Sequence, residues 1–157
     1  MTQNIQKSSL QTRYTAVEDY GIIGDLRTAA LVGVDGSVDF MCFPEFDSPS
    51  IFCANADAGR GGRFQIQPQL ESMREKHLYL PDTNVLITRF LSDSGVAEVS
   101  NYMVVSEEGE ACEQALVRRA KCVHGHRGGV ATRFSRYTIR GRVRRRTSSP
   151  VRLPCRP

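Results

Sequence analysis

The sequence has no long hydrophobic run, and this absence excludes one class of protein. No apolar stretch among the 157 residues approaches the ~20 residues that a membrane-spanning helix needs. The polar start of the chain, residues 1–13, also has no apolar segment of the kind that a secretory signal requires. We therefore expect a cytoplasmic protein with no membrane partner, in which residues 1–13 form a flexible leader.

Cysteine and histidine are too few and too scattered to indicate a metal site or a disulfide framework. The five cysteines are an odd number and match neither a zinc-ligand spacing nor a small disulfide scaffold, so we interpret them as reduced thiols. His124 and His126 form an HxH pair, which we interpret as part of a solvated loop. Residues 59–62, Gly-Arg-Gly-Gly, lack the Lys-Ser/Thr pair of a phosphate-binding loop. The sequence predicts neither a metal nor a cofactor.

Acidic residues are absent from the last part of the chain. All 17 Asp and Glu residues lie at or before Glu113, whereas residues 125–157 hold ten arginines, so the net charge of +4 averages an acidic body and a basic tail. The apolar residues of this tail are too scattered to form one face of an element, and we expect the tail to be disordered. The abrupt change suggests translation from a shifted reading frame, a hypothesis that sequencing of the downstream locus would test.

The body of the chain contains short β-type segments that are separated by turns. We predict strands over residues 29–34, 37–43, 63–67, 85–91, 96–104 and 116–123. Asp35-Gly36 joins the first two as a two-residue hairpin turn, in which both residues would have positive φ. Residues 92–95 suit a four-residue hairpin loop between the fourth and the fifth.

Two further segments have less clear patterns. Ser48 followed by Pro49 is typical of an N-cap and a first helical residue, so we predict a short helix or a helical turn over Pro49–Asp57. Residues 73–79 fit either a helical turn or an extended connector. Short strands without a long amphipathic helix indicate a mainly β fold, namely a partial antiparallel β-sandwich over residues 14–124, followed by the basic tail over residues 125–157.

An ordered motif runs through the first predicted hairpin and the loop after it. It comprises Val17 to Tyr20, Ile23 to Asp25, Thr28 to Val32, Asp35 to Phe40, Cys42, Pro44 and Phe46 to Phe52. In this order the residues resemble the opening of bacterial glycoside hydrolase family fifteen proteins, the glucoamylase-like and trehalase-like enzymes. Matches continue through Leu80–Leu86 and Leu116–Arg119 and fade after Gly125, so about four fifths of the chain resemble the family.

The resemblance implies a truncated N-terminal β-sandwich domain. In the family this domain precedes an (α/α)6 barrel, which carries the two catalytic glutamates and has no counterpart in this chain. A glycosidase needs two carboxyl groups that flank the scissile bond, so the resemblance transfers no catalytic residue to this sequence. It implies a non-catalytic chain that packs on the barrel of an intact parent and meets an α-glucan or a trehalose-type sugar only through that parent.

Contact with such a barrel is predicted for the aromatic loop from Pro44 to Phe52. Proline and Ser48 restrict this loop, and Phe46 supplies an apolar anchor. The predicted interface residues are Phe40, Phe43, Pro44, Phe46, Asp47 and Phe52. The nearby carboxylate pairs, Glu45 with Asp47 and Asp35 with Asp39, are interpreted as turn and capping residues, because spacing alone shows no water-excluding cleft.

Two other functions remain open from the sequence. Residues 140–146, with Phe134 and Tyr137 nearby, could neutralise phosphates and stack on bases, as in a nucleic-acid-binding protein, although such attraction carries no sequence specificity. A free-standing carbohydrate-binding module would need an exposed aromatic face, and the chain has no tryptophan. Phe40 stands where members of the family usually carry Trp. RNA retention with and without the tail and titration with maltose or trehalose would discriminate these alternatives.

Overall fold

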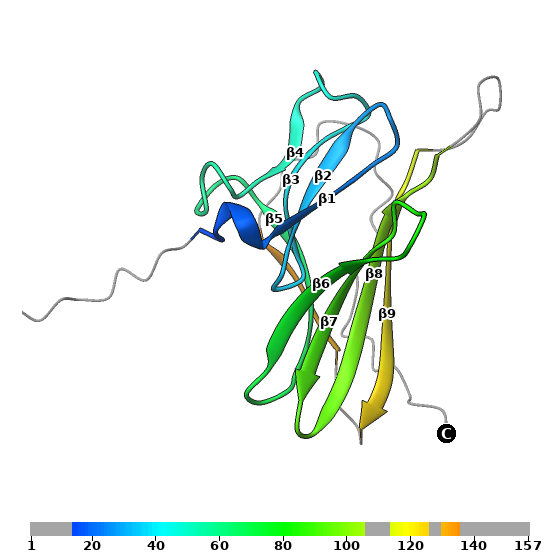
Figure 1. The fold of residues 1–157 in the computed structure, drawn as a ribbon. Helices are drawn as coiled ribbons and strands as arrows, with labels where there is room; N and C mark the ends of the chain where they lie inside the picture. The colour runs from blue at the N-terminus through cyan, green and yellow to red at the C-terminus, as the bar shows by residue number, and fades with distance from the viewer. Residues whose placement is uncertain (1–13, 106–113, 126–129, 136–157) are drawn as a thin grey trace, which may run out of the picture.

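The computed structural model describes residues 14–105, 114–125 and 130–135 (Figure 1). These residues form a short 3-10 turn, η1 (Val17–Asp19), and the strands β1 (Tyr20–Gly24), β2 (Ala29–Gly33), β3 (Ser37–Cys42), β4 (Ser50–Cys53), β5 (Arg63–Pro68), β6 (Arg74–Tyr79), β7 (Leu86–Ser92), β8 (Gly95–Met103), β9 (Leu116–Gly125) and β10 (Val130–Ser135). None of these described residues belongs to a helix of sufficient length and hydrophobicity to span a membrane.

The strands form two antiparallel sheets, which confirms the predicted mainly β fold (Figure 1). Sheet A has the order β1-β2-β3-β5-β10, and β4 pairs with β3 off this path. Sheet B has the order β6-β7-β8-β9. The first residues of β3, Ser37 and Val38, pair with β5, whereas Phe40 to Cys42 pair with β4. The chain therefore leaves sheet A after β5, builds sheet B and returns to sheet A as β10.

The two sheets share an apolar core. The main buried cluster contains Ile23, Ala30, Val32, Val38, Met41 and Phe52 of sheet A with Leu86 and Met103 of sheet B. A second cluster joins Ile66 of β5 to Phe90, Ala97 and Val99 of sheet B. Burial in β8 alternates at every residue, as expected for a strand with one face on the core.

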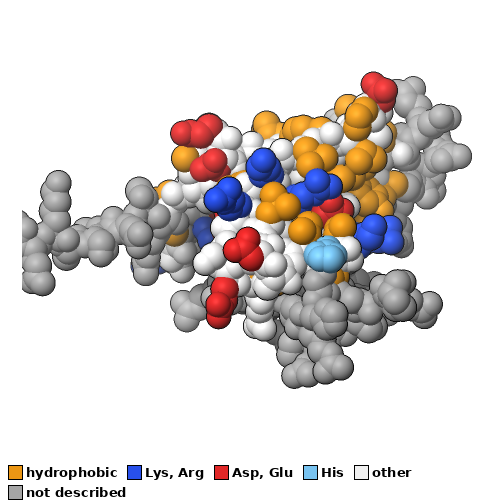
Figure 2. Space-filling view, turned by 60° about the horizontal axis from the view of Figure 1, so that its bottom comes forward, with side chains coloured by type: hydrophobic (Ala, Val, Ile, Leu, Met, Phe, Trp, Pro, Cys, Tyr) orange, Lys and Arg blue, Asp and Glu red, His pale blue; other side chains and the backbone are white. Residues whose placement is uncertain are grey.

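The outward face of sheet B carries both apolar and charged side chains. Ile87 and Leu91 of β7 and Val96 and Tyr102 of β8 are half-buried there. Between them, Arg89 Nε donates to Glu98 Oε1 at 2.7 Å. Figure 2 likewise shows hydrophobic side chains gathered on part of one molecular face, with Lys and Arg side chains among them.

The β2–β3 hairpin is confirmed, but the details of its predicted turn are wrong. Gly36 N donates to Gly33 O at 2.9 Å, so residues 34–36 form a three-residue loop. Within it only Gly36 has a positive φ, of 78°, as in a type I turn that is followed by a left-handed residue. A Cβ atom at Gly36 would lie 2.2 Å from Ile66 O, so the position also needs glycine for space.

The β7–β8 hairpin is also confirmed, with a shorter loop than predicted. Ser92 pairs with Gly95, which leaves only Asp93 and Ser94 between the strands. The segment 73–79, for which a helical turn and an extended connector were both open, is extended, and its residues Arg74–Tyr79 form β6.

The predicted helix or helical turn over Pro49–Asp57 is wrong in its first half, which forms strand β4, whereas Asp57 N donates to Cys53 O at 3.1 Å in a turn at its end. Cys53 pairs with Phe40 and Phe52 with Met41, so β3 satisfies the main-chain groups that a helix would have satisfied internally. Ser48 does not cap a helix; its hydroxyl oxygen accepts a hydrogen bond from Glu45 N at 3.2 Å. Pairing with a neighbouring strand has therefore overridden a local helix signal.

Strand β10 lies within the segment that was predicted to be disordered. Its six residues pair with Arg63 to Pro68 of β5. The other parts of the predicted tail, and the predicted leader over residues 1–13, lie outside the described residues apart from the end of β9. Strand β1 was not predicted as a separate element.

One side chain of sheet B closes the outer edge of β1. The Tyr79 hydroxyl oxygen accepts a hydrogen bond from Ile22 N at 2.8 Å, and the hydroxyl donates to Ile22 O at 2.9 Å. Ile22 lies in an edge strand, yet both of its main-chain polar groups are satisfied without a further strand.

Candidate functional site

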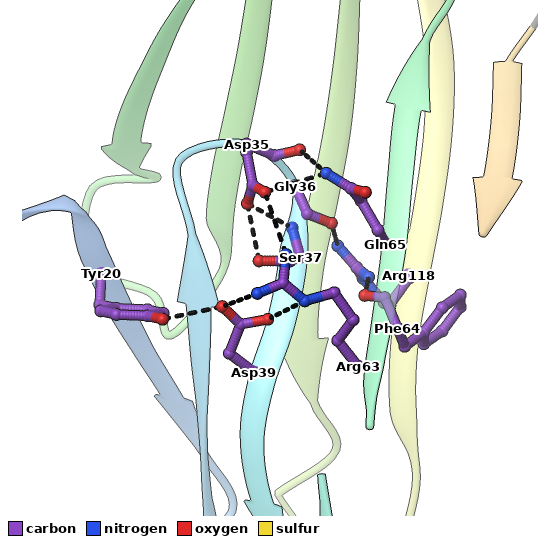
Figure 3. Close-up of polar contacts among 9 residues, drawn as sticks. All are labelled: Tyr20, Asp35, Gly36, Ser37, Asp39, Arg63, Phe64, Gln65 and Arg118. Atoms are coloured by element: carbon purple, nitrogen blue, oxygen red, sulfur yellow. Dashed lines mark hydrogen bonds and ion pairs between the residues drawn. The ribbon is translucent and has the colours of Figure 1, made fainter. Parts of the chain in front are cut away.

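A cluster of polar side chains surrounds the β2–β3 turn (Figure 3). Asp35 Oδ1 accepts hydrogen bonds from the main-chain N of Ser37 at 3.0 Å and from its hydroxyl at 2.6 Å. Asp35 Oδ2 accepts from Gln65 Nε2 of β5 at 2.9 Å. Asp35 therefore fixes the turn and ties it to the neighbouring strand, which is the structural role expected for it.

Asp39 is the most deeply buried carboxylate of this cluster, with none of its surface exposed. Its Oδ2 accepts from the Tyr20 hydroxyl at 2.8 Å, and its Oδ1 forms an ion pair with Arg63 Nε at 3.2 Å. Burial, together with the hydrogen bond to Asp39, raises the pKa of Tyr20 to about 12. The charge of Asp39 is thus compensated by Arg63 within the fold, and its carboxylate is inaccessible to any substrate.

Arg118 of β9 connects sheet B to the turn of sheet A. Its guanidinium donates three hydrogen bonds of 2.7 Å, to Asn101 Oδ1, to Phe64 O and to Gly36 O. It also lies over the Phe64 ring, 4.8 Å from the centroid. Burial lowers the pKa of Arg118 to about 10, which leaves it charged at neutral pH. We call the residues drawn in Figure 3 the Arg118 network.

A different arrangement occurs at the other end of β3, where an open depression of about 550 Å³ is lined by Arg27, Glu45, Phe46 and Asp47. We call this the loop end, which consists of the β1–β2 turn, residues 25–28, and the β3–β4 loop, residues 43–49. The Phe46 side chain is 64% exposed there. The loop end therefore combines an accessible aromatic ring with charges of both signs.

The β1–β2 turn is held by one carboxylate. Asp25 Oδ1 accepts from Arg27 N at 3.0 Å and from Thr28 N at 2.9 Å. The Thr28 hydroxyl then donates to Cys42 O at 2.7 Å, and Phe46 N donates to Arg27 O at 3.0 Å. These bonds fix the backbone that carries Arg27 against the backbone that carries Phe46.

The β3–β4 loop is held from within and from β9. Glu45 N donates to Ser48 Oγ at 3.2 Å, and Ser48 N donates to Glu45 O at 3.1 Å. Gln114, just before β9, donates through Nε2 to Pro44 O at 3.2 Å and to Asp25 Oδ2 at 3.4 Å. The backbones of both loops are therefore tied to each other, while their charged side chains point into an open depression.

The charged side chains of the depression have no partners among the residues that the structure describes. Arg27, Glu45 and Asp47 make no side-chain hydrogen bond and no ion pair within residues 14–105, 114–125 and 130–135. Opposite charges thus line one hollow without neutralising each other. Their donors and acceptors are available to a ligand or to another protein surface.

The structure separates the six predicted interface residues into two groups. Phe52 is buried in the core, Phe43 packs against the core and Phe40 is half-buried. Pro44, Phe46 and Asp47 are exposed at the loop end. Contact of any of the six with another domain stays a prediction, but only the second group presents its surface to solvent.

Two arginines of these sites were not singled out from the sequence. Arg118 was detectable, because alternation along β9 places it on the same face as Leu116 and Ala120, which pack against the core clusters. Arg27 lies in a turn that is distant in sequence from Phe46, and no local pattern predicts that the two line one depression.

The described part of the chain was searched for a metal-binding cluster and for reactive thiols. No group of three or more His, Cys, Asp or Glu side chains within it is placed to hold a metal ion. Cys42 and Cys53 form no disulfide, and burial raises the pKa of the Cys42 thiol. Of the predicted HxH pair, His126 lies outside the described residues.

The fold and its polar sites define a β-sandwich domain in which the buried charges serve structure and an open, charged hollow lies at one end. The family described as "Trehalase-like, N-terminal" matches residues 9–135. The chain therefore belongs to the trehalase-like N-terminal domain family. The match continues through β10, beyond the point near Gly125 where the resemblance was expected to fade.

Curated relatives of the chain are trehalases. The trehalase of Mycolicibacterium smegmatis is 29% identical over 132 residues, which are 74% of this chain and 20% of that protein. The trehalase of Thermoplasma volcanium is 33% identical over 99 residues, 62% of this chain and 16% of that protein. Trehalase 1 of Sulfolobus acidocaldarius is 37% identical over 101 residues, 64% of this chain and 16% of that protein. The chain thus spans a fifth or less of these relatives, and no solved structure matches it.

Proposed function

We propose that this chain is the non-catalytic N-terminal β-sandwich of a trehalase-type α-glycoside hydrolase and that it acts in carbohydrate metabolism by packing on a catalytic domain. The observation that carries the proposal is the family match over residues 9–135, combined with the small share of each trehalase, 16–20%, that aligns with the chain. The rest of such an enzyme supplies the catalytic domain, an (α/α)6 barrel in the family that the sequence resembles.

The described carboxylates support a non-catalytic role. Glycoside hydrolysis needs an acid and a second carboxylate on either side of the scissile bond, in a site that controls water. Asp39 is buried and paired with Arg63, and Asp35 is engaged by Ser37 and Gln65. Glu45 and Asp47 line a hollow that is open to solvent. None of these arrangements provides a water-excluding pair of acids.

The loop end is the surface that we assign to the catalytic domain. Leu26 is 94% exposed and Phe46 is 64% exposed, and both are large apolar side chains on backbones that hydrogen bonds hold in place. Rigid loops lose little conformational entropy on docking, and apolar anchors supply most of the energy of such contacts. Phe43 and Phe52 support this surface from the core side.

A chimeric enzyme tests the proposal. In the trehalase of Mycolicibacterium smegmatis, the aligned N-terminal portion is replaced by residues 9–135 of this chain, and trehalose hydrolysis and thermal unfolding are measured. We expect the chimera to hydrolyse trehalose, whereas this chain alone releases no glucose. We also expect Leu26→Ala and Phe46→Ala in the chimera to lower its melting temperature by a few degrees.

A matched control is Tyr102→Ala, which removes a half-buried side chain from the outward face of sheet B. The proposal is contradicted if this chain alone cleaves trehalose, or if the folded chimera is inactive. The loop end is the wrong surface if Tyr102→Ala destabilises the chimera more than Leu26→Ala does.

A further inference from the structure

The outward face of sheet B differs from the usual outer face of a β-sandwich. In antiparallel sandwiches the face that points away from the core is normally polar. Strands β6, β7, β8 and β9 lie side by side in this order (Figure 1). The two middle strands, β7 and β8, carry apolar side chains at most of their outward positions, namely Ile87, Leu91, Val96 and Tyr102. Sheet B therefore has apolar surface on both of its faces.

The charges at the outward positions of the two middle strands neutralise each other. Arg89 of β7 lies directly opposite Glu98 of β8, and Arg89 Nε donates to Glu98 Oε1 at 2.7 Å. Glu98 is also the one acidic residue at the outward positions of the described strands β6 to β9. The middle of this face is thus apolar and carries no net charge.

The two outer strands of sheet B carry unpaired cations on the same face. Lys76 of β6 lies opposite Arg89, and Lys121 of β9 lies opposite Glu98, so all four side chains point outward. We call the exposed cations of the outer strands the basic borders: Arg74 and Lys76 on β6, and Arg119 and Lys121 on β9. None of them forms a side-chain hydrogen bond or an ion pair within residues 14–105, 114–125 and 130–135.

The spacing of the basic borders matches the width of one helix. Strands β6 and β9 are three strand spacings apart, which is about 14 Å at about 4.8 Å each. An α-helix with its side chains is about 10–12 Å wide. The nine residues of β8 extend for about 30 Å, the length of a helix of about 20 residues. One helix that lies along β7 and β8 would therefore cover the apolar middle and reach both borders.

Charge and shape disfavour three other occupants. A second copy that packed through the same face would bring basic borders close to basic borders. Single-stranded nucleic acid stacks its bases on aromatic rings, and Tyr102 is the one aromatic residue at the outward positions of the described strands β6 to β9. A membrane surface takes up apolar side chains that protrude, whereas those of β7 and β8 are half-buried between longer Lys and Arg side chains.

We propose that the outward face of sheet B is a docking surface for an acidic amphipathic α-helix of another protein. The apolar stripe of this helix packs on β7 and β8, and its Asp and Glu side chains on both flanks pair with the basic borders. The loop end, which we assign to the catalytic domain, belongs to sheet A. The docking helix is therefore supplied by a separate protein, and the assignment does not depend on the proposed function.

Titration of the full chain with two synthetic peptides tests this assignment. The first is a helix-forming peptide of about 20 residues, with leucines along one stripe and glutamates on both flanks. The second has the same composition in scrambled order, so that it measures the sequence-independent attraction of the basic tail. Amide shifts of the isotope-labelled chain are followed by NMR. We expect saturable shifts in β7 and β8 with the first peptide and binding at least about tenfold weaker with the second.

Substitutions on the face should weaken binding of the first peptide. Lys76→Gln combined with Lys121→Gln removes one cation from each border and should weaken binding by about three- to tenfold, as expected for two exposed ion pairs. Ile87→Thr keeps a β-branched residue in β7 but removes apolar surface, and should weaken binding by about fivefold. Thermal melts establish that every variant is folded.

The matched control is Arg60→Glu, which changes the net charge by the same amount at an exposed position between β4 and β5. It should bind the first peptide within about twofold of the parent chain. Equal binding of the two peptides, or equal binding by Arg60→Glu and the Lys76→Gln/Lys121→Gln chain, overturns the proposal. So does tighter binding of single-stranded RNA or of phosphatidylserine vesicles to this face, and so do shifts in β7 and β8 that depend on protein concentration alone, because another occupant then takes the place of the helix.

Discussion

Charged side chains of the same types lie at the two ends of β3, but they are paired at one end and unpaired at the other. Around the β2–β3 turn, the Arg118 network includes two arginines and two aspartates, and each of the four has a partner. At the loop end, one arginine and two carboxylates line a hollow with no ion pair among the described residues. Burial explains the difference, because an unpaired charge costs several kcal/mol in the interior and little at the surface. Pairing therefore marks structural charges, and its absence marks charges that a partner can use.

The aromatic residues of the segment 43–52 give the largest contrast. Phe52→Ala removes a ring from the core, where Phe52 is 8% exposed, and should destabilise the fold by about 3–5 kcal/mol. Phe46→Ala removes an exposed ring and should change stability by no more than about 0.5 kcal/mol. Urea unfolding of both variants checks this, and a Phe46→Ala cost close to that of Phe52→Ala would break the comparison.

The arginines provide the next contrast. Arg118→Met keeps most of the side-chain volume but removes the guanidinium hydrogen bonds to Asn101 Oδ1, Phe64 O and Gly36 O, so we expect a loss of about 3 kcal/mol. Arg27→Met should cost at most about 0.5 kcal/mol, since no described side chain pairs with Arg27. Arg118→Lys should recover little of the loss, because one ammonium cannot reproduce three diverging hydrogen bonds. Chemical denaturation measures all three, and full rescue by lysine would show that charge alone matters.

We expect the same contrast in stability, with a smaller difference, between the carboxylates Asp39 and Asp47. Asp39→Asn weakens the contacts with Arg63 and Tyr20 in a buried position and should cost about 2 kcal/mol. Asp47→Asn changes an exposed group and should be neutral within about 0.5 kcal/mol. Differential scanning calorimetry distinguishes the two, and equal melting temperatures would contradict the structural role of Asp39.

The smallest expected effect concerns pH. Burial lowers the pKa of His77, against smaller opposing contributions from a hydrogen bond to the main chain of Gly33 and from Asp35 and Asp19. Because the unfolded chain binds the proton more readily, stability should fall as pH drops below about 6.5. His77→Gln should flatten this part of the profile. Melting temperatures between about pH 7 and pH 5 test this, and parallel profiles for His77→Gln and the parent would refute it.

Local patterns in the sequence predict the hairpins because their turns depend on a few adjacent residues. The β2–β3 and β7–β8 pairs follow from Asp35-Gly36 and from the cluster around Ser92 to Gly95. Strands β4 and β10 depend on partners far along the chain, β3 and β5, and their own residues suggested a helix and disorder. Non-local pairing is not visible in a short sequence window.

The same distinction applies to the sites, because some of their features follow from local sequence and others require contacts between distant segments. The turn role of Asp35 follows from its position before glycine, and exposure of Phe46 agrees with its place between a proline and a serine turn. The joint lining of one hollow by Arg27 and Phe46 requires the β1–β2 turn to lie against the β3–β4 loop. That contact is a property of the folded chain only.

The tyrosine that reaches from β6 to β1 has a consequence for association between molecules. A second chain that approached the exposed side of β1 would find the amide and the carbonyl of Ile22 already engaged by the Tyr79 hydroxyl. Strand addition there would have to break both bonds first, so Tyr79 protects this border of the sandwich from intermolecular sheet growth.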